Sequence, residues 1–210
     1  MKIIDAGYCI TTPLDGTAIL KSIESAARTC YKSEDRITEY SAMSMVMSLI
    51  KHGHEAMLEH EFITVRFICD RGVSHEIVRH RVASFAQEST RYCNYSKDKF
   101  GNEITVIRPC YFAEDTENYR IWKASCEAAE KAYFALLDSD ASPQEARSVL
   151  PTSLKTEIVM TANLREWRHF FRLRTSEAAH PQMRELTIPL LRELKSRIPI
   201  IFDDIEVKQD

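Results

Sequence analysis

The pattern of apolar and polar positions changes its period several times along the chain. Residues 15–31 repeat apolar side chains at helical spacing, and residues 43–50 do the same ahead of Gly53, a residue typical of helix C-termini. Residues 61–69, EFITVRFIC, instead alternate apolar and polar side chains and predict a strand. The first ten residues, MKIIDAGYCI, predict another short strand. The first part of the chain therefore mixes helices with strands.

The second half continues this mixture and has clearer helix boundaries. Ser142–Glu145, SPQE, is a capping box with proline at the first helical position. Asn163 and Glu166 form a similar pair at the start of an arginine-rich segment. The patterns predict a strand over 103–109, a helix over 117–139, a short helix that stops before Pro151, a strand over 156–162, and helices over 163–174 and 181–197, the last bent at Pro189.

Polar residues gather between these two halves. Ser74 can cap a helix that carries HEIVRHR, and Glu76, Arg79 and His80 would then share one helical face. The tract that follows, up to Tyr95, has weak periodicity and is predicted as loop.

Length and composition favour one globular α/β domain. The chain has 210 residues, of which 44% are hydrophobic and 28% charged, enough for one substantial core. No linker, repeat or low-complexity segment appears. We therefore expect a single catalytic domain over 1–210, with a central mixed or antiparallel sheet flanked by helices (an α/β or α+β fold).

Cysteine and glycine usage narrow the class of protein further. Six scattered cysteines without a CxxC pair, and an N-terminus that breaks its apolar run at Asp5, predict free thiols, no signal peptide and a cytoplasmic location. The five glycines are isolated, which excludes the GxGxxG and GxxxxGK loops. If the protein binds a nucleotide, arginines and helix N-termini must hold its phosphates.

Arginines are concentrated in two places although the formal net charge is −3. Residues 79–91 read RHRVASFAQESTR, and the segment from Asn163 to Arg174 contains four arginines against one acidic residue. An individual arginine could belong to a solvated helix face. The clusters together favour a small anionic ligand, because an acidic chain is a poor nucleic-acid binder.

The first cluster resembles the signature of the flavin-dependent thymidylate synthases, RHR followed after seven residues by serine. The resemblance extends to HGHEAMLEH at 52–60, to RHRVASFAQESTRYCNYS, to Arg147 before VLP and to FRLR at 171–174. It implies reductive methylation of dUMP to dTMP, with 5,10-methylenetetrahydrofolate as carbon donor, FAD as hydride carrier and NADPH or NADH as reductant. It also implies a homotetramer with active sites shared between subunits, with no metal, nucleic-acid or membrane partner.

The resemblance also assigns roles to individual residues. Arg174 would be catalytic, facing the uracil ring and favouring its N3-deprotonated form. The implied dUMP-binding residues are Glu76, Arg79, Gln87, Ser89, Arg91, Arg147 and Arg174. The implied FAD-binding residues are His54, Arg79, His80, Arg81, Gln87, Asn163, Arg165 and His169, with His54 near the folate as well.

The sequence departs from the family pattern at four positions. Gln87 stands where glutamate is common and Glu76 where glutamine is common, so the two could exchange roles as donor and acceptor. Ala56 replaces a serine or threonine that usually meets the cofactor. His169 replaces an asparagine and adds a group that titrates near neutral pH.

The same residues also allow other interpretations. Ser89 could simply cap a turn, and Cys93 has no histidine paired with it by sequence, so neither is predicted to be a nucleophile. A metal-dependent hydrolase would use the histidines at 52, 54, 60, 75 and 80, but no HExxH motif occurs. A nucleic-acid-binding module would use both arginine clusters with Phe85, Tyr92 and Tyr95 for stacking.

Overall fold

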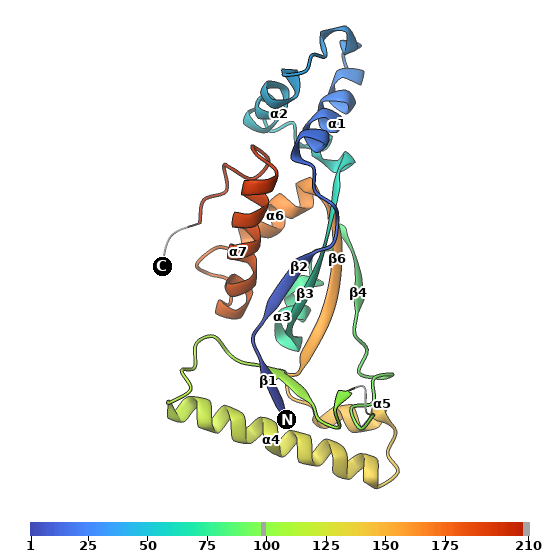
Figure 1. The fold of residues 1–210 in the computed structure, drawn as a ribbon, viewed down its shortest axis with the longest axis vertical. Helices are drawn as coiled ribbons and strands as arrows, with labels where there is room; N and C mark the ends of the chain where they lie inside the picture. The colour runs from blue at the N-terminus through green and yellow to red at the C-terminus, as the bar shows by residue number, and fades with distance from the viewer. Residues whose placement is uncertain (98–99, 208–210) are drawn as a thin grey trace. The chain divides into compact units, whose positions relative to one another are not determined.

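The computed structural model describes residues 1–97 and 100–207. The chain divides into two compact units, each assembled from three separate segments. Unit 1 contains Met1–Gly7, Phe67–Arg79 and Ala86–Val159, and unit 2 contains Tyr8–Arg66, His80–Phe85 and Met160–Asp210. Both contain helices and strands, so the predicted mixed α/β class is confirmed (Figure 1). The assignment of 1–210 as one domain stays a prediction.

The described residues form two sheets. A two-stranded parallel sheet joins β1 (Lys2–Ile4) to β5 (Thr105–Ile107), with Lys2 opposite Thr105. The larger sheet has the strand order β2-β3-β6-β4, formed by β2 (Gly7–Ile10), β3 (Phe62–Asp70), β6 (Lys155–Asn163) and β4 (Ala83–Gln87). Strand β3 follows its sequence pattern closely, because Ile63, Val65, Phe67 and Cys69 are all fully buried. The alternation thus predicted the buried face as well as the strand.

Unit 1 has its core around α4 (Glu117–Asp138), the helix predicted over 117–139. Thr116 caps it by accepting a hydrogen bond from the Tyr119 amide. Its buried residues Cys126 and Tyr133 pack with Tyr95, Ile104, Val106, Ala146 and Leu154. The capping box at Ser142 is present and begins α5 (Pro143–Ala146), which continues into a 3-10 turn, η4 (Arg147–Val149).

Helix α3 (Arg71–Ile77) differs from the prediction at both ends. Asp70, not Ser74, is its N-cap and accepts a hydrogen bond from the Val73 amide, whereas the Ser74 hydroxyl donates to the Arg71 carbonyl. The helix therefore starts four residues earlier and ends at Ile77. The RHR sequence lies beyond it, so the predicted shared helical face was wrong.

Unit 2 contains two helix pairs. Helix α1 (Gly16–Thr29) packs on α2 (Ser41–Lys51), and α6 (Leu164–Arg174) packs on α7 (Pro181–Arg197) (Figure 1). Short 3-10 helices η1 (Glu34–Arg36) and η2 (Glu55–His60) flank α2. The buried face of α2 is formed by Ala42, Val46 and Leu49. Met43 and Met47, predicted on the apolar stripe, are about half exposed instead.

The aromatic face of α6 forms the centre of the unit 2 core. Trp167, Phe170 and Phe171 are fully buried, and Trp167 Nε1 donates a hydrogen bond to the Ile63 carbonyl at 3.0 Å. Phe202, from the segment after α7, packs edge-on against Phe171 with 5.5 Å between ring centroids. This packing fixes α6, the helix that carries the second arginine cluster.

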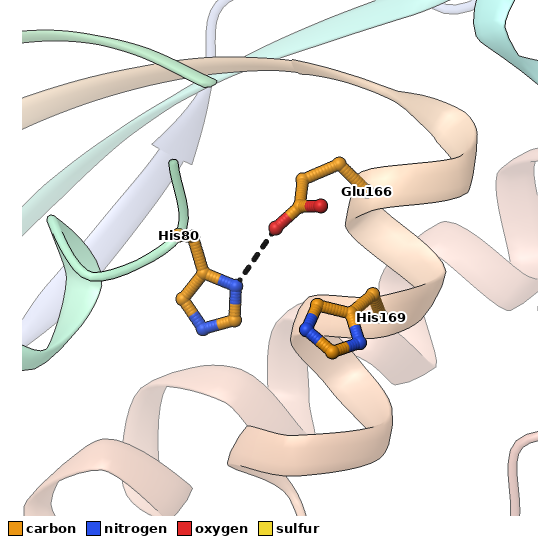
Figure 2. A group of neighbouring side chains, drawn as sticks. All are labelled: His80, Glu166 and His169. Atoms are coloured by element: carbon orange, nitrogen blue, oxygen red, sulfur yellow. Dashed lines mark hydrogen bonds and ion pairs between the residues drawn. The ribbon is translucent and has the colours of Figure 1, made fainter. Parts of the chain in front are cut away.

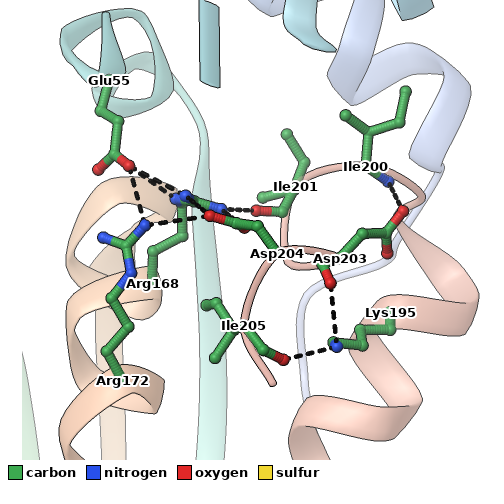
Figure 3. A network of polar contacts seen from close by, with 9 residues as sticks. All are labelled: Glu55, Arg168, Arg172, Lys195, Ile200, Ile201, Asp203, Asp204 and Ile205. Carbon is green, nitrogen blue, oxygen red and sulfur yellow. Dashed lines mark hydrogen bonds and ion pairs between the residues drawn. The ribbon is translucent and has the colours of Figure 1, made fainter. Parts of the chain in front are cut away.

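Arg168 anchors the same helix from its other side (Figure 3). Its guanidinium, fully buried, makes two hydrogen bonds to Asp204 of 2.6 and 2.7 Å, two to Glu55 of 3.2 and 3.0 Å, and one to the Ile201 carbonyl. Planar guanidinium groups suit such paired contacts with carboxylates. Arg168 therefore joins α6 to η2 and to the segment after α7, and serves the fold rather than a ligand.

Two further observations concern earlier predictions. All six cysteines are free thiols, as predicted. Over the parts of the chain that the structure describes, no helix is both long and apolar enough to cross a bilayer.

Candidate active site

A cleft of about 410 Å³ lies beside the first turns of α6, within unit 2. Asn163 caps this helix, and its side-chain oxygen accepts a hydrogen bond from the Glu166 amide at 2.8 Å. The cleft is lined by Glu55, Glu59, Val82, Asn163, Arg165, Glu166, His169 and Arg172. Three of the residues predicted to bind FAD, Asn163, Arg165 and His169, are thus brought together at a helix N-terminus, where anions are favoured.

The arginines in the cleft are paired with carboxylates. Arg165 contacts Glu59 at 2.5 Å, and Arg172 contacts Glu55 at 3.2 Å. The Arg165 and Glu59 side chains are 54% and 44% exposed, and an ion pair so open to water contributes little stability. Arg165 can therefore exchange this partner for a phosphate at low cost.

His80 lies buried at the side of the same helix (Figure 2). Its Nδ1 is 2.9 Å from the Glu166 carboxylate, and its Nε2 accepts a hydrogen bond of 3.1 Å from Arg174 Nε. Burial lowers the pKa of His80; the Glu166 carboxylate opposes this effect, while Arg174 and His169 add to it. His80 is therefore held as a neutral imidazole between an acid and a cation.

His80 and Glu166, together with His169, could also be interpreted as a metal site. One ligand atom each from His80, Glu166 and His169 lie within 4.8 Å of one another. However, both ring nitrogens of His80 are already hydrogen-bonded, and a metal on Nε2 would have to displace the guanidinium of Arg174. A fixed cation beside the ligand atoms disfavours a second cation. The cluster also differs from the five histidines considered from the sequence, of which it includes only His80.

Five predicted FAD residues are not part of the lining of this cleft: His54, Arg79, His80, Arg81 and Gln87. His54 precedes η2 and is exposed, with its ring 6.0 Å from that of His52. Arg81 is exposed as well. Their roles in binding stay predictions.

The predicted dUMP residues of unit 1 gather around the end of β4. Gln87 donates hydrogen bonds from Nε2 to the hydroxyls of Ser74 and Thr156, at 2.8 and 3.2 Å. In the turn that follows, the Ser89 hydroxyl accepts a hydrogen bond from the Arg91 amide at 3.3 Å, the capping role considered from the sequence. These contacts hold the backbone of the turn in place.

Arg147 reaches the same turn from the end of α5. Its Nη1 lies 3.4 Å from the hydroxyl of Thr90. Ser89 and Arg91 are the sequence neighbours of Thr90, so Arg147 lies near the turn that carries them. Arg91 is exposed and lies 5.4 Å from the centre of the Tyr92 ring. Arg91 and the Ser89 hydroxyl on this turn, with Arg147 beside it, are the kinds of donor that a phosphate requires.

Glu76 and Arg79 lie elsewhere in unit 1, near the end of α3, where the Arg79 amide donates to the Glu76 carbonyl at 3.3 Å. Arg174, by contrast, belongs to unit 2. The predicted dUMP residues are thus divided between the two units.

Sequence reasoning missed one residue of this site. Glu166 was read only as a capping partner of Asn163, but its carboxylate turns to His80 instead. The available signal was its isolation, since it is the only acidic residue in a helix with four arginines. It also missed strand β4, within the tract predicted as loop.

Fold and site together describe an α/β protein with donor groups for anionic ligands in each unit. A solved structure, the UMP/dUMP methylase PolB from Streptomyces cacaoi bound with 5-Br dUMP, has the same fold. Its TM-score is 0.77 over 97% of this chain and 96% of that chain, at 22% sequence identity.

Sequence comparison defines the family. The family model described as Thymidylate synthase complementing protein matches residues 14–200. A flavin-dependent thymidylate synthase of Corynebacterium aurimucosum is 34% identical over 203 residues, covering 88% of this chain and 79% of that protein. One from Pyrococcus furiosus is 34% identical over 167 residues, covering 79% and 68%. The chain belongs to the thymidylate synthase complementing protein family, and the predicted class of enzyme is confirmed.

Proposed function

We propose that the protein converts dUMP to dTMP by reductive methylation, with FAD, 5,10-methylenetetrahydrofolate and NADPH or NADH. The observation that carries this proposal is the family match, which spans residues 14–200 and so includes every residue of both sites. The homotetramer with shared active sites and the cytoplasmic location belong to the same proposal.

The cleft beside α6 has donors that fit FAD. Arg165 lies in the first turn of α6, where the helix dipole favours an anion, and it carries a charge that its exposed partner Glu59 can release. FAD, when bound, supplies the hydride that completes the new methyl group. Arg165 would hold its phosphates, and Asn163 and His169 would line the same cleft.

Arg174 is the residue proposed to act on the substrate. Its Nε–H is donated to His80, so contact with uracil falls to the terminal nitrogens of the guanidinium. A guanidinium stays protonated at any working pH, and a fixed cation stabilises the negative charge of N3-deprotonated uracil. Ser89, Arg91 and Arg147 would hold the dUMP phosphate, since they meet at one turn.

The test is the visible spectrum of the purified protein combined with a product assay. The protein should bind FAD, lose its flavin absorbance with NADPH faster when dUMP is present, and form dTMP when methylenetetrahydrofolate is added. UMP should be assayed in parallel, because the solved neighbour is described as a UMP/dUMP methylase. A protein that neither carries nor takes up FAD would refute the proposal.

The variant Arg165→Ala separates binding from chemistry in this assay. Removing the guanidinium should weaken FAD binding by about tenfold or more, since one charge-assisted contact is worth about 1.5–3 kcal/mol. Glu59→Gln is the matched variant, because it frees Arg165 of its carboxylate and should leave FAD binding unchanged or tighter. Equal FAD affinity in the wild type and Arg165→Ala would remove Arg165 from the cofactor site.

A further inference from the structure

Three side chains of unit 2 form a continuous chain of hydrogen bonds that ends at the proposed catalytic arginine. Glu166 contacts His80 Nδ1 at 2.9 Å, and Arg174 Nε contacts His80 Nε2 at 3.1 Å. The His80 side chain is 3% exposed and that of Glu166 is 11% exposed. Figure 2 shows the His80 ring facing the Glu166 carboxylate and the His169 ring, which both project from the same helix.

The donors and acceptors allow only one arrangement of protons on His80. A guanidinium has N–H donors and no acceptor, so Arg174 Nε must be the donor and His80 Nε2 must offer its lone pair. The ring proton then has to sit on Nδ1, where it is donated to the Glu166 carboxylate. With the proton on Nε2, or on both nitrogens, two N–H groups would face each other at Arg174.

The surroundings keep His80 in this state. The charged or titratable groups that face it are Glu166, His169 and Arg174, all from α6, and the Phe170 ring packs edge-on at 4.9 Å. Burial is the largest effect and lowers the pKa of His80, which favours the neutral ring that the hydrogen bond from Arg174 requires. Glu166 therefore selects the tautomer without adding a charge to the ring.

We propose that Glu166 and His80 are positioning residues for Arg174: Glu166 fixes the tautomer of His80, and His80 fixes the guanidinium. This inference rests on the proposed function, in which Arg174 acts on uracil. A carboxylate that orients an imidazole is an established device, and misplacing a catalytic group by about 1 Å can cost about 100-fold in rate. Glu166 would thus influence the reaction without contacting the substrate.

The first experiment compares Glu166→Ala, Glu166→Gln and Glu127→Gln. In Glu166→Ala the ring can take its proton at Nε2, so kcat for dTMP formation should fall by about 10- to 100-fold. Because Glu166 also lines the cleft proposed for FAD, kcat is compared at saturating FAD and dUMP, so that the loss reports the position of Arg174 and not cofactor occupancy. Glu166→Gln keeps an oxygen acceptor for Nδ1–H and should retain most of the activity at alkaline pH. Glu127, on α4 and 3.9 Å from Lys123, is the matched carboxylate outside the site, and its variant should behave as wild type.

The pH profile distinguishes positioning from a purely structural role. Protonating His80 removes the acceptor for Arg174, so kcat should fall on the acid side. The Glu166 carboxylate raises the pKa of His80 relative to burial alone, so its neutralisation in Glu166→Gln lowers that pKa. The acid limb of kcat should therefore move to lower pH. An unmoved limb, or Glu166→Ala with wild-type kcat, would overturn the inference.

A second measurement does not depend on activity. In protein carrying ¹⁵N-labelled histidine, His80 should give the signals of a neutral ring protonated at Nδ1, assigned by their loss in His80→Gln. The Glu166→Ala variant should lose this tautomer preference. A charged His80, or one protonated at Nε2 at neutral pH, would overturn the relay even if the enzyme makes dTMP. If the wild type makes no dTMP, the proposed function fails while the spectrum still decides the geometry.

Discussion

Replacing Arg168 by methionine should destabilise the protein far more than the same replacement at Arg172. Both arginines lie on α6 and contact Glu55 and Asp204, but Arg168 is fully buried whereas Arg172 is 46% exposed (Figure 3). Arg168 also donates to the buried carbonyl of Ile201, which would lose its partner. Methionine keeps the length and apolar stem of the side chain and removes only the charged fork.

The burial of each arginine determines how much stability its replacement costs. Removing one partner of a buried ion pair costs about 3–5 kcal/mol. We expect the lower end, about 3 kcal/mol, because Asp204 is 44% exposed and can be hydrated, and because Arg172 still contacts both carboxylates. For a chain of this size that corresponds to a fall in Tm of roughly 6–12 °C. The exposed pairs of Arg172 are worth at most about 1 kcal/mol, or roughly 2–4 °C.

The assay is thermal unfolding followed by circular dichroism for the wild type, Arg168→Met and Arg172→Met. Urea unfolding of the same proteins would convert the midpoints into free energies. Because Arg168 anchors the helix that carries Asn163, Arg165 and Arg174, FAD affinity should fall with it. Equal losses of Tm in the two variants would refute the assignment of Arg168 as the buried anchor of α6.

Three further predictions concern the same parts of the molecule. The hydrogen bond from Arg168 lowers the pKa of Asp204 in the folded protein. Asp204 therefore stabilises the fold at pH values above the ordinary carboxylate pKa, and this contribution is lost as the pH falls through the pKa of Asp204 in the folded protein. The Tm of Arg168→Met should consequently fall less on acidification than that of the wild type. Asn163→Ala removes the cap of α6 and should cost about 1 kcal/mol in urea unfolding, whereas Asn163→Asp keeps an acceptor and should cost little. Burial raises the pKa of Cys69 to about 12 and that of Cys126 to about 11. In native protein, iodoacetamide should therefore label the exposed Cys9 and Cys30 and leave Cys69 and Cys126 unlabelled, which peptide mass spectrometry would measure.

Local sequence patterns predicted most of the helices and strands. The alternation in β3, the capping box of α5, the long stripe of α4 and the Asn163 cap of α6 are all present in the structure. Each of these patterns depends on residues that are close together in the sequence, so it can be recognised without knowing how the elements pack. The signature beginning at Arg79 was likewise local, and it was enough to identify the family.

Strand β4 illustrates what local patterns leave open. Its residues, ASFAQ, are small or polar except for Phe85, and none is fully buried, so the sequence has no strong apolar–polar alternation here. The strand exists because β6 lies beside it in the sheet. Helix α3 is a second example, since either Asp70 or Ser74 could have capped it and the structure uses Asp70. Where two local solutions have similar energies, tertiary contacts choose between them.

The sequence by itself determined the family, the mixed α/β class and the spacing of arginines along α6. Only the tertiary structure decided which of these arginines stabilises the fold and which lies at a candidate site. Arg168 and Arg174 have similar local sequence patterns, but they contact different partners. The tertiary structure also placed Glu166 against His80, 86 positions apart in sequence, and His80 against Arg174, 94 positions apart. Hydrogen bonds between residues so distant along the chain depend on how strands and helices pack, and no local period encodes them.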